Sequence, residues 1–178
     1  MKKVFFFILI CSFSIKSFSQ IQFSLTGGTI IEMVDDLPFD GYGYYAGITT
    51  IFPLSKSWSF TPEIRFTNIE HYENNYSQKI HYFEMPLSFE HKTKLKKNKY
   101  FKFNVGGFWN ISIAGSSMSY YENSNSTYRN EENLLGVGVL CGAGFEINNF
   151  YVGVEPNFRY YDVSGAGLSL NTKIAYRF

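Results

Sequence analysis

The sequence predicts an all-β protein: a closed antiparallel up-and-down transmembrane β-barrel of eight strands. Segments of period-2 alternation and an N-terminal export signal support this prediction. The last segment shows the pattern best, since from Leu168 to Phe178 alternate residues are large or apolar, and those between them are small, polar or charged. Side chains alternate between the faces of a strand, so one face of this segment is apolar and the other polar.

The end of the chain indicates how such a barrel is assembled. Tyr176 and Phe178 share the apolar face, and Phe178 is the last residue. A terminal aromatic strand behind a signal peptide is typical of bacterial outer-membrane β-barrels. We therefore expect Tyr176 and Phe178 to form a C-terminal assembly signal that the barrel-assembly machinery recognises.

The N-terminus has the three parts of a secretory signal peptide. Two lysines are followed by an apolar run over residues 4–10, and Ser-Phe-Ser at 17–19 offers small residues to a signal peptidase. The run is too short for a membrane-spanning helix, which needs about 20 apolar residues. We expect residues 1–19 to be cleaved on export and residues 20–178 to form the outer-membrane barrel domain.

Composition excludes several other classes of protein. Charged residues make up 17% of the chain, below the roughly 25% of soluble domains, whereas aromatic residues reach 20%. The formal net charge of +1 argues against a nucleic-acid partner, because nucleic-acid-binding domains are basic. The sequence contains no long apolar stretch that would indicate a helical membrane protein.

Eight segments alternate with period 2 and are expected to be strands. Short and long connections also alternate between them, as in outer-membrane barrels with short periplasmic turns and longer extracellular loops. We expect long loops at residues 32–41, 70–79 and 114–133. The expected strands are residues 22–31, 42–52, 58–69, 80–91, 100–113, 134–147, 150–161 and 167–178.

The polar face of these strands favours a membrane barrel over a soluble, lipocalin-like barrel that binds an apolar ligand. A soluble barrel would coat its outside with charged residues, but here the polar face is rich in Gly, Ser, Thr and Asn. The interior of an eight-stranded barrel is just wide enough to be filled by side chains. Small polar residues therefore suit the lumen, and the apolar face suits lipid.

Charged residues also occur on the expected lumen face, with five acids matching five bases. Charges buried in a narrow lumen must be paired, so we expect an ion-pair network that plugs the barrel. A gated proton or ion path is the alternative. The expected network residues are Glu63, Arg65, Glu84, Glu90, Lys102, Glu146, Glu155, Arg159, Lys173 and Arg177.

The fourth segment carries a recognisable motif. Residues 82–89 read Tyr-Phe-Glu-Met-Pro-Leu-Ser-Phe, which resembles the Tyr-x-Glu-Ile-Pro-Leu signature of PorT-like outer-membrane β-barrels of Bacteroidetes-type bacteria, with Met85 in place of the usual Ile. Residues 142–146, Gly-Ala-Gly-Phe-Glu, are similar to a glycine-rich segment of that family. The resemblance implies an outer-membrane barrel but no activity.

The sequence offers no catalytic, cofactor or metal site. His81 and His91 lie near opposite ends of one expected strand, roughly 30 Å apart at the usual strand rise, and His71 falls in an expected loop. An outer-membrane lipid-modifying enzyme would need a converging Ser/His/acid set. His81 with Ser77 or Ser119 and Glu84 or Glu122 is the available combination, but alternation puts His81 and Glu84 on opposite faces.

The long loops contain the other candidate surface. Tyr120, Tyr121 and Tyr128 stand among Ser and Asn residues, a composition typical of binding loops. The expected outer loops are acidic, whereas residues 92–99 form a lysine-rich turn that could attract anionic lipid headgroups. Outer-membrane lipid, lipopolysaccharide and an extracellular or periplasmic protein are therefore the expected partners.

The function expected from these observations is that of a non-enzymatic integral outer-membrane protein, either structural or partner-binding through its extracellular loops. The alternatives are a small-solute or ion channel, a soluble lipocalin-like binder and an outer-membrane lipid-modifying enzyme. The sequence identifies neither a ligand nor an oligomeric state.

Overall fold

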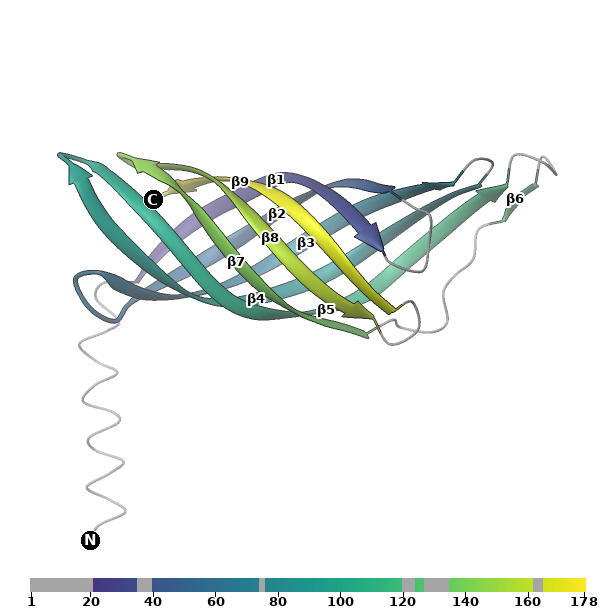
Figure 1. Ribbon diagram of the computed structural model, residues 1–178, viewed down its shortest axis with the longest axis horizontal. Coiled ribbons are helices and arrows are strands. Elements are labelled where there is room, and N and C mark those ends of the chain that lie inside the picture. Colours follow the sequence, from purple (N-terminus) through teal and green to yellow (C-terminus); the bar gives the residue numbers. More distant parts are fainter. Residues whose placement is uncertain (1–20, 35–39, 74–75, 120–123, 127–134, 162–164) are drawn as a thin grey trace, which may run out of the picture.

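The computed structural model describes residues 21–34, 40–73, 76–119, 124–126, 135–161 and 165–178. Figure 1 shows the strands wound obliquely around a common axis as a cylinder. The strands are β1 (Gln22–Val34), β2 (Asp40–Pro53), β3 (Trp58–Glu73), β4 (Tyr76–Lys96), β5 (Lys99–Ser119), β6 (Ser124–Ser126), β7 (Leu135–Ile147), β8 (Phe150–Tyr161) and β9 (Gly165–Arg177).

The strands form a closed antiparallel ring. They are hydrogen-bonded in the order β4-β3-β2-β1-β9-β8-β7-β5, and a pairing between β4 and β5 closes the ring. The short strand β6 pairs with the end of β5 and lies outside the ring. The remaining eight strands make the up-and-down barrel, so the fold predicted from the sequence is confirmed. In the described residues, no helix is both long and apolar enough to span a bilayer.

The two ends of the barrel differ in their connections. One end, which we call the turn end, holds the connections at residues 54–57, 97–98 and 148–149 together with the C-terminus (Figure 1). The opposite end, the loop end, holds the connections between β1 and β2, β3 and β4, β5 and β7, and β8 and β9. The three connections predicted to be short therefore lie together at one end, but the long loop predicted at residues 70–79 was wrong, because β3 and β4 leave only residues 74–75 between them.

The apolar side chains of the strands point outward. On β7, Val137 and Val139 are 58% and 60% exposed, whereas Gly136, which alternates with them, is buried. The buried side chains of the other strands are largely polar or charged. This contradicts the soluble lipocalin-like alternative, because such a barrel would put its apolar face inside.

Several strands extend beyond the predicted boundaries. β3, β4 and β5 continue through parts of the expected loops 70–79 and 114–133, and β4 and β5 also run through most of residues 92–99. The alternation of apolar and polar residues ends where both faces of a strand meet water, but backbone pairing can continue. Hydrophobic periodicity therefore marks the lipid-embedded part of these strands, not their full length.

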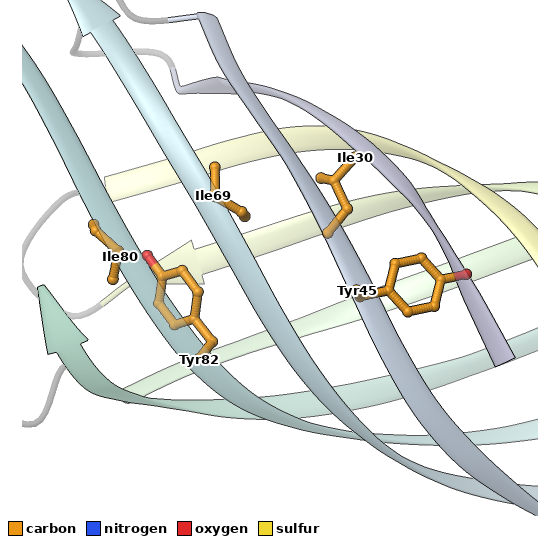
Figure 2. Close-up of a cluster of buried hydrophobic side chains, with 5 residues drawn as sticks. All are labelled: Ile30, Tyr45, Ile69, Ile80 and Tyr82. Carbon is orange, nitrogen blue, oxygen red and sulfur yellow. The ribbon is translucent and has the colours of Figure 1, made fainter. Parts of the chain in front are cut away.

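A small apolar cluster lies inside the barrel on the wall formed by β1 to β4. Figure 2 shows its five buried side chains, which come from four neighbouring strands. The Tyr45 hydroxyl donates a hydrogen bond to the Thr172 carbonyl oxygen of β9, at 3.0 Å. The cluster consists of Ile30, Tyr45, Ile69, Ile80 and Tyr82.

Glycines on the inner face of β7 make room for large side chains from its neighbours. A Cβ atom at Gly138 would overlap the ring of Phe108, and one at Gly144 would lie 2.7 Å from the Tyr151 hydroxyl. The glycine-rich segment noted in the sequence therefore has a steric role: because these positions of β7 carry no side chain, the lumen has room for side chains from β5 and β8.

Candidate functional site

The lumen contains three clusters of charged side chains, arranged from one end of the barrel to the other. Each cluster joins strands that are not consecutive in sequence. The turn-end cluster is Glu90, Lys102, Glu146 and Arg177; the central cluster is Glu63, Arg65, Glu155 and Lys173; and the loop-end cluster is Glu32, His71, Glu84 and Arg159.

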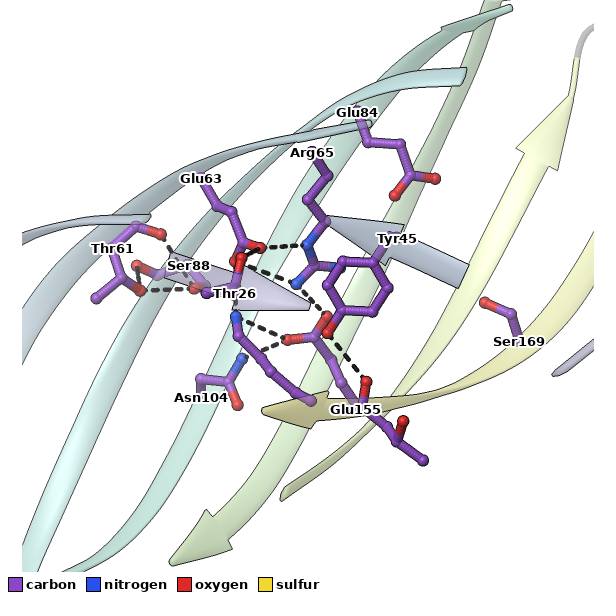
Figure 3. Close-up of polar contacts among 12 residues, drawn as sticks. Thr26, Tyr45, Thr61, Glu63, Arg65, Glu84, Ser88, Asn104, Glu155 and Ser169 are labelled. Atoms are coloured by element: carbon purple, nitrogen blue, oxygen red, sulfur yellow. Dashed lines mark hydrogen bonds and ion pairs between the residues drawn. The ribbon is translucent and has the colours of Figure 1, made fainter. Parts of the chain in front are cut away.

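The central cluster joins opposite walls of the barrel (Figure 3). Glu63 and Arg65 are two residues apart on β3, so both face the lumen, and Arg65 Nε donates to Glu63 Oε1 at 2.7 Å. The other arm of the guanidinium reaches Glu155 Oε1 on β8 at 2.6 Å. Lys173 on β9 contacts Glu63 Oε2 at 2.6 Å and Glu155 Oε2 at 3.7 Å.

Neutral side chains complete the coordination of this cluster. Thr26 Oγ1 donates to Glu63 Oε1 at 2.6 Å, and Asn104 Nδ2 donates to Glu155 Oε2 at 3.1 Å. The guanidinium of Arg65 lies over the Tyr45 ring, 4.6 Å from its centroid, within the range of a cation–π interaction. Glu63, Arg65 and Glu155 are therefore buried with partners for their charges, as stable burial of charge requires, whereas the Lys173 side chain is 14% exposed.

The turn-end cluster is a chain of alternating charges. Lys102 Nζ lies 2.8 Å from Glu90 Oε1 and 2.7 Å from Glu146 Oε2. Glu146 also pairs with Arg177, and Arg177 Nη1 donates to Gln22 Oε1 at 3.0 Å. The Glu90 and Arg177 side chains are 17% and 16% exposed, so this cluster is more exposed to solvent than the central cluster.

The loop-end cluster centres on Arg159. Its Nη1 donates to Glu84 Oε1 at 2.6 Å, its Nε lies 3.6 Å from Glu32 Oε1, and its guanidinium covers the Phe108 ring at 5.2 Å. His71 Nε2 lies 3.7 Å from Glu32 Oε2. This cluster links strands that are three places apart around the ring, because Glu84 is on β4 and Arg159 is on β8.

The loop assignments of Glu32 and His71 were wrong. Both lie on lumen-facing strand positions, with relative exposures of 0% and 6%. The signal that could have found Glu32 is its parity, since it continues the inward series that includes Thr26 and Ile30. Around Glu32 the outward positions Ile31 and Met33 are still apolar, whereas near His71 the outward series is broken by Asn68 and Glu70, and both predicted strands ended too early.

All ten charged residues predicted to share the lumen face lie there, and the structure distributes them over the three clusters. Tyr176 and Phe178 lie on the outer face, with ring centroids 5.2 Å apart, and the Phe178 N–H donates to the Phe23 carbonyl oxygen at 3.0 Å. Tyr120, Tyr121 and Tyr128 fall outside the described residues.

His71 lies in the lumen, whereas His81 and His91 lie at separate positions of β4. Asn68 Nδ2 donates to His81 Nδ1 at 2.8 Å on the outer face, where the Phe66 ring stacks on the imidazole. Glu84 lies in the lumen on the other side of the sheet, as alternation predicts. His91 packs against Trp58. The described residues contain no group of three potential metal ligands.

A cavity of about 40 Å³ lies between the turn-end and central clusters. It extends from Asn149 and Arg177 at the rim to Lys173, and hydroxyl groups line much of it. One of these, Thr49 Oγ1, is buried without a hydrogen-bond partner among the described residues. The space suits a few water molecules, which need polar partners of this kind.

We expect water-borne ions to reach this cavity but not to pass the central cluster. In a Cys141→Ala variant of the barrel domain 20–178, Thr49→Cys should react with Ag⁺ in the folded protein, whereas Thr67→Cys, beyond the central cluster and 0% exposed, should not. After treatment with Ag⁺ the protein is denatured, and the thiols that remain free are labelled with a fluorescent maleimide. A loss of label shows that the cysteine had reacted with Ag⁺. Equal reaction rates at the two positions would contradict the expected barrier.

Comparison with known proteins identifies the family. Residues 12–162 match the family described as "Outer membrane protein beta-barrel domain". Similar solved structures include Neisserial surface protein A (TM-score 0.54), the outer membrane enzyme PagL (0.52), and Ail, the attachment invasion locus protein of Yersinia pestis (0.51). Each is 12% identical to this chain; 88–89% of this chain and 97–98% of the solved chain are covered.

At this identity the solved structures establish a shared fold and nothing about activity. No curated protein is significantly similar in sequence. The family match covers most of the chain, and it agrees with the closed ring and the outward apolar face. The chain therefore belongs to the outer membrane protein β-barrel domain family.

Proposed function

We propose that this protein is a non-enzymatic, non-conducting outer-membrane barrel that acts through the surfaces at its two ends. The observation that carries the proposal is the contact between Arg65 on β3 and Glu155 on β8, at 2.6 Å across the lumen. With the lumen occupied by paired side chains, the exposed ends are the parts of the molecule left to engage partners.

Ion passage through this lumen would require the central cluster to separate. Arg65 joins Glu63 and Glu155, and Lys173 lies against the same two carboxylates. An ion entering between them would leave charges uncompensated in a narrow space, at a cost of several kcal/mol. The same arrangement argues against the small-solute channel alternative.

Conductance in planar bilayers tests the proposal. We expect the purified protein to produce no discrete conductance steps, and the double variant Arg65→Ala/Lys173→Ala to produce them, because two unpaired carboxylates would then repel each other and admit water. Lys56→Ala, an exposed turn residue, is the control. Steady conductance of the unmodified protein that changes in Glu155→Ala would favour the channel alternative.

The loop end is the proposed site of partner binding, with Tyr120, Tyr121 and Tyr128 as its candidate residues. Support comes from their composition and from Ail, which is described as an attachment invasion locus protein and was also solved with the heparin analogue sucrose octasulfate. Replacing residues 120–134 by a Gly-Ser linker should leave the barrel folded. It should also remove the cross-links that form between this protein and its binding partners on intact cells. Unchanged cross-links would contradict the loop assignment.

The motif in β4 supports a closer, PorT-like relationship. Its alternate residues Tyr82, Glu84 and Pro86 are on the lumen side of the strand, and Glu84 pairs with Arg159. The motif thus supplies one half of an ion pair between two strands that are not neighbours in the ring. We further propose that residues 1–19 direct export and that Tyr176 and Phe178 engage the assembly machinery in a membrane containing lipopolysaccharide.

The enzyme alternative rests on the likeness to PagL, which is described as an outer membrane enzyme. Among the described residues, the hydrogen-bond partner of His81 is the Asn68 amide, which cannot serve as an acyl-accepting nucleophile. A mass shift of lipid A in a strain producing this protein, absent with His81→Ala, would overturn the non-enzymatic proposal.

A further inference from the structure

The turn end carries a concentration of uncompensated positive charge. In outer-membrane barrels the short turns face the periplasm. The β4–β5 hairpin contains no acidic residue between positions 92 and 99, and the described parts of the other turns add Lys56 and no acid. The hairpin lysines are Lys92, Lys94, Lys96, Lys97 and Lys99.

The hairpin that presents these lysines is held in place. Its strands remain paired up to Lys96 and Lys99, and Asn98 makes the tight turn at φ 56°. The Asn148 N–H of the neighbouring β7–β8 turn donates to the Asn98 carbonyl oxygen at 2.9 Å. The basic hairpin and the adjacent asparagine turn therefore form one connected surface.

Alternation directs part of this charge toward the barrel axis. Lys92 and Lys94 share the parity of Glu90, whose side chain faces the lumen, and Lys92 Nζ lies 5.7 Å from the Tyr100 ring centroid. Leu95, of opposite parity and 53% exposed, is on the lipid side. Lipid headgroups surround the barrel, so a lysine pointing to the mouth of the lumen is better placed for a soluble partner.

A cavity of about 330 Å³ lies at this mouth. Its lining includes two cationic side chains and the amide groups of the two turns. Its acidic residue, Glu146, is paired with Lys102 and with Arg177, so among the described lining residues Lys92 supplies the positive charge that no ion pair compensates. The volume is that of a small-ligand pocket, and the lining includes Lys92, Arg177, Asn98, Asn148 and Asn149.

We propose that the turn end binds a carboxylate-bearing glycopeptide polymer of the periplasm, the chemistry of cell-wall peptidoglycan. Lysines attract carboxylates over several ångströms, and asparagine amides both donate to and accept from sugar hydroxyls and peptide groups. A basic hairpin beside an amide-lined pocket combines these two requirements. This site is separate from the loop end and does not depend on the lumen being closed.

Co-sedimentation of the folded, detergent-solubilised protein with purified peptidoglycan sacculi tests this proposal. We expect binding that weakens with added salt and falls on the order of tenfold in Lys92→Gln/Lys94→Gln/Lys96→Gln, since each exposed charge pair contributes little by itself. Asn98→Gly retains the positive φ and removes one amide, and should also weaken binding. Lys79→Gln, at the loop end, is the control and should bind like the unmodified protein.

Three results would overturn the proposal. Binding that survives the triple substitution would exclude the lysines, and equal binding to sacculi whose carboxylates have been amidated would exclude the charge match. Nanodiscs with phosphatidylglycerol provide the third comparison: if the triple variant lost affinity for these lipids and kept affinity for sacculi, the hairpin would serve the membrane surface instead. Retention of the compact band in unheated SDS establishes that each variant is folded.

Discussion

Arg65→Met is expected to lower the free energy of unfolding by about 3–5 kcal/mol, the usual cost of removing one partner from a buried ion pair. Arg65 is 1% exposed and contacts two carboxylates, Glu63 and Glu155. Lys173 would then be the one base of the central cluster left to compensate both carboxylates. Urea unfolding in lipid vesicles, followed by fluorescence of the two tryptophans, measures the loss.

A double substitution separates the value of the pair from the cost of leaving a charge unpaired. Arg65→Met/Glu155→Leu should be much closer in stability to the unmodified protein than Arg65→Met, because Lys173 and Glu63 remain as a matched pair. Lys56→Met, on an exposed turn, should change stability by less than about 0.5 kcal/mol. If Arg65→Met cost no more than Lys56→Met, the central cluster would not hold the barrel walls together.

Gly28→Ala is expected to prevent closure of the barrel, with a loss above about 4 kcal/mol. A Cβ atom at this position would fall on the carbonyl oxygen of Thr172, and would lie 2.8 Å from the Thr172 carbonyl carbon and 2.9 Å from Tyr45 Cε1. The oxygen belongs to the backbone of β9 and accepts a hydrogen bond from Tyr45. It cannot move without opening the seam between β1 and β9.

The neighbouring glycine provides a matched control. A Cβ atom at Gly27 would have the Tyr45 carbonyl oxygen as its nearest contact, at 3.3 Å, so Gly27→Ala should fold. The measurement is the fraction of refolded protein that runs compactly in unheated SDS and shifts on boiling. A normal compact fraction for Gly28→Ala would show that β1 and β9 pack less closely than described.

The sequence predicts which charged residues face the lumen, but it does not predict which of them form ion pairs. The period-2 pattern indicates which side of each strand faces the lumen, so alternation alone is enough to group Glu63, Arg65 and Glu155 on the inner face. Alternation says nothing about which charges meet, because that depends on the register accumulated around the ring. The Arg65–Glu155 contact joins residues 90 positions apart, and nothing local to either strand predicts it.

The sequence by itself determined the fold class and the face of each lipid-embedded strand, because lipid outside and a packed lumen inside impose opposite demands on alternate side chains. Only the tertiary structure decided how far each strand extends and which charges pair. Glu32 and His71 illustrate the limit: both lie just beyond the predicted ends of their strands, where backbone pairing continues. Ring closure brings them beside Arg159 and assembles the loop-end cluster.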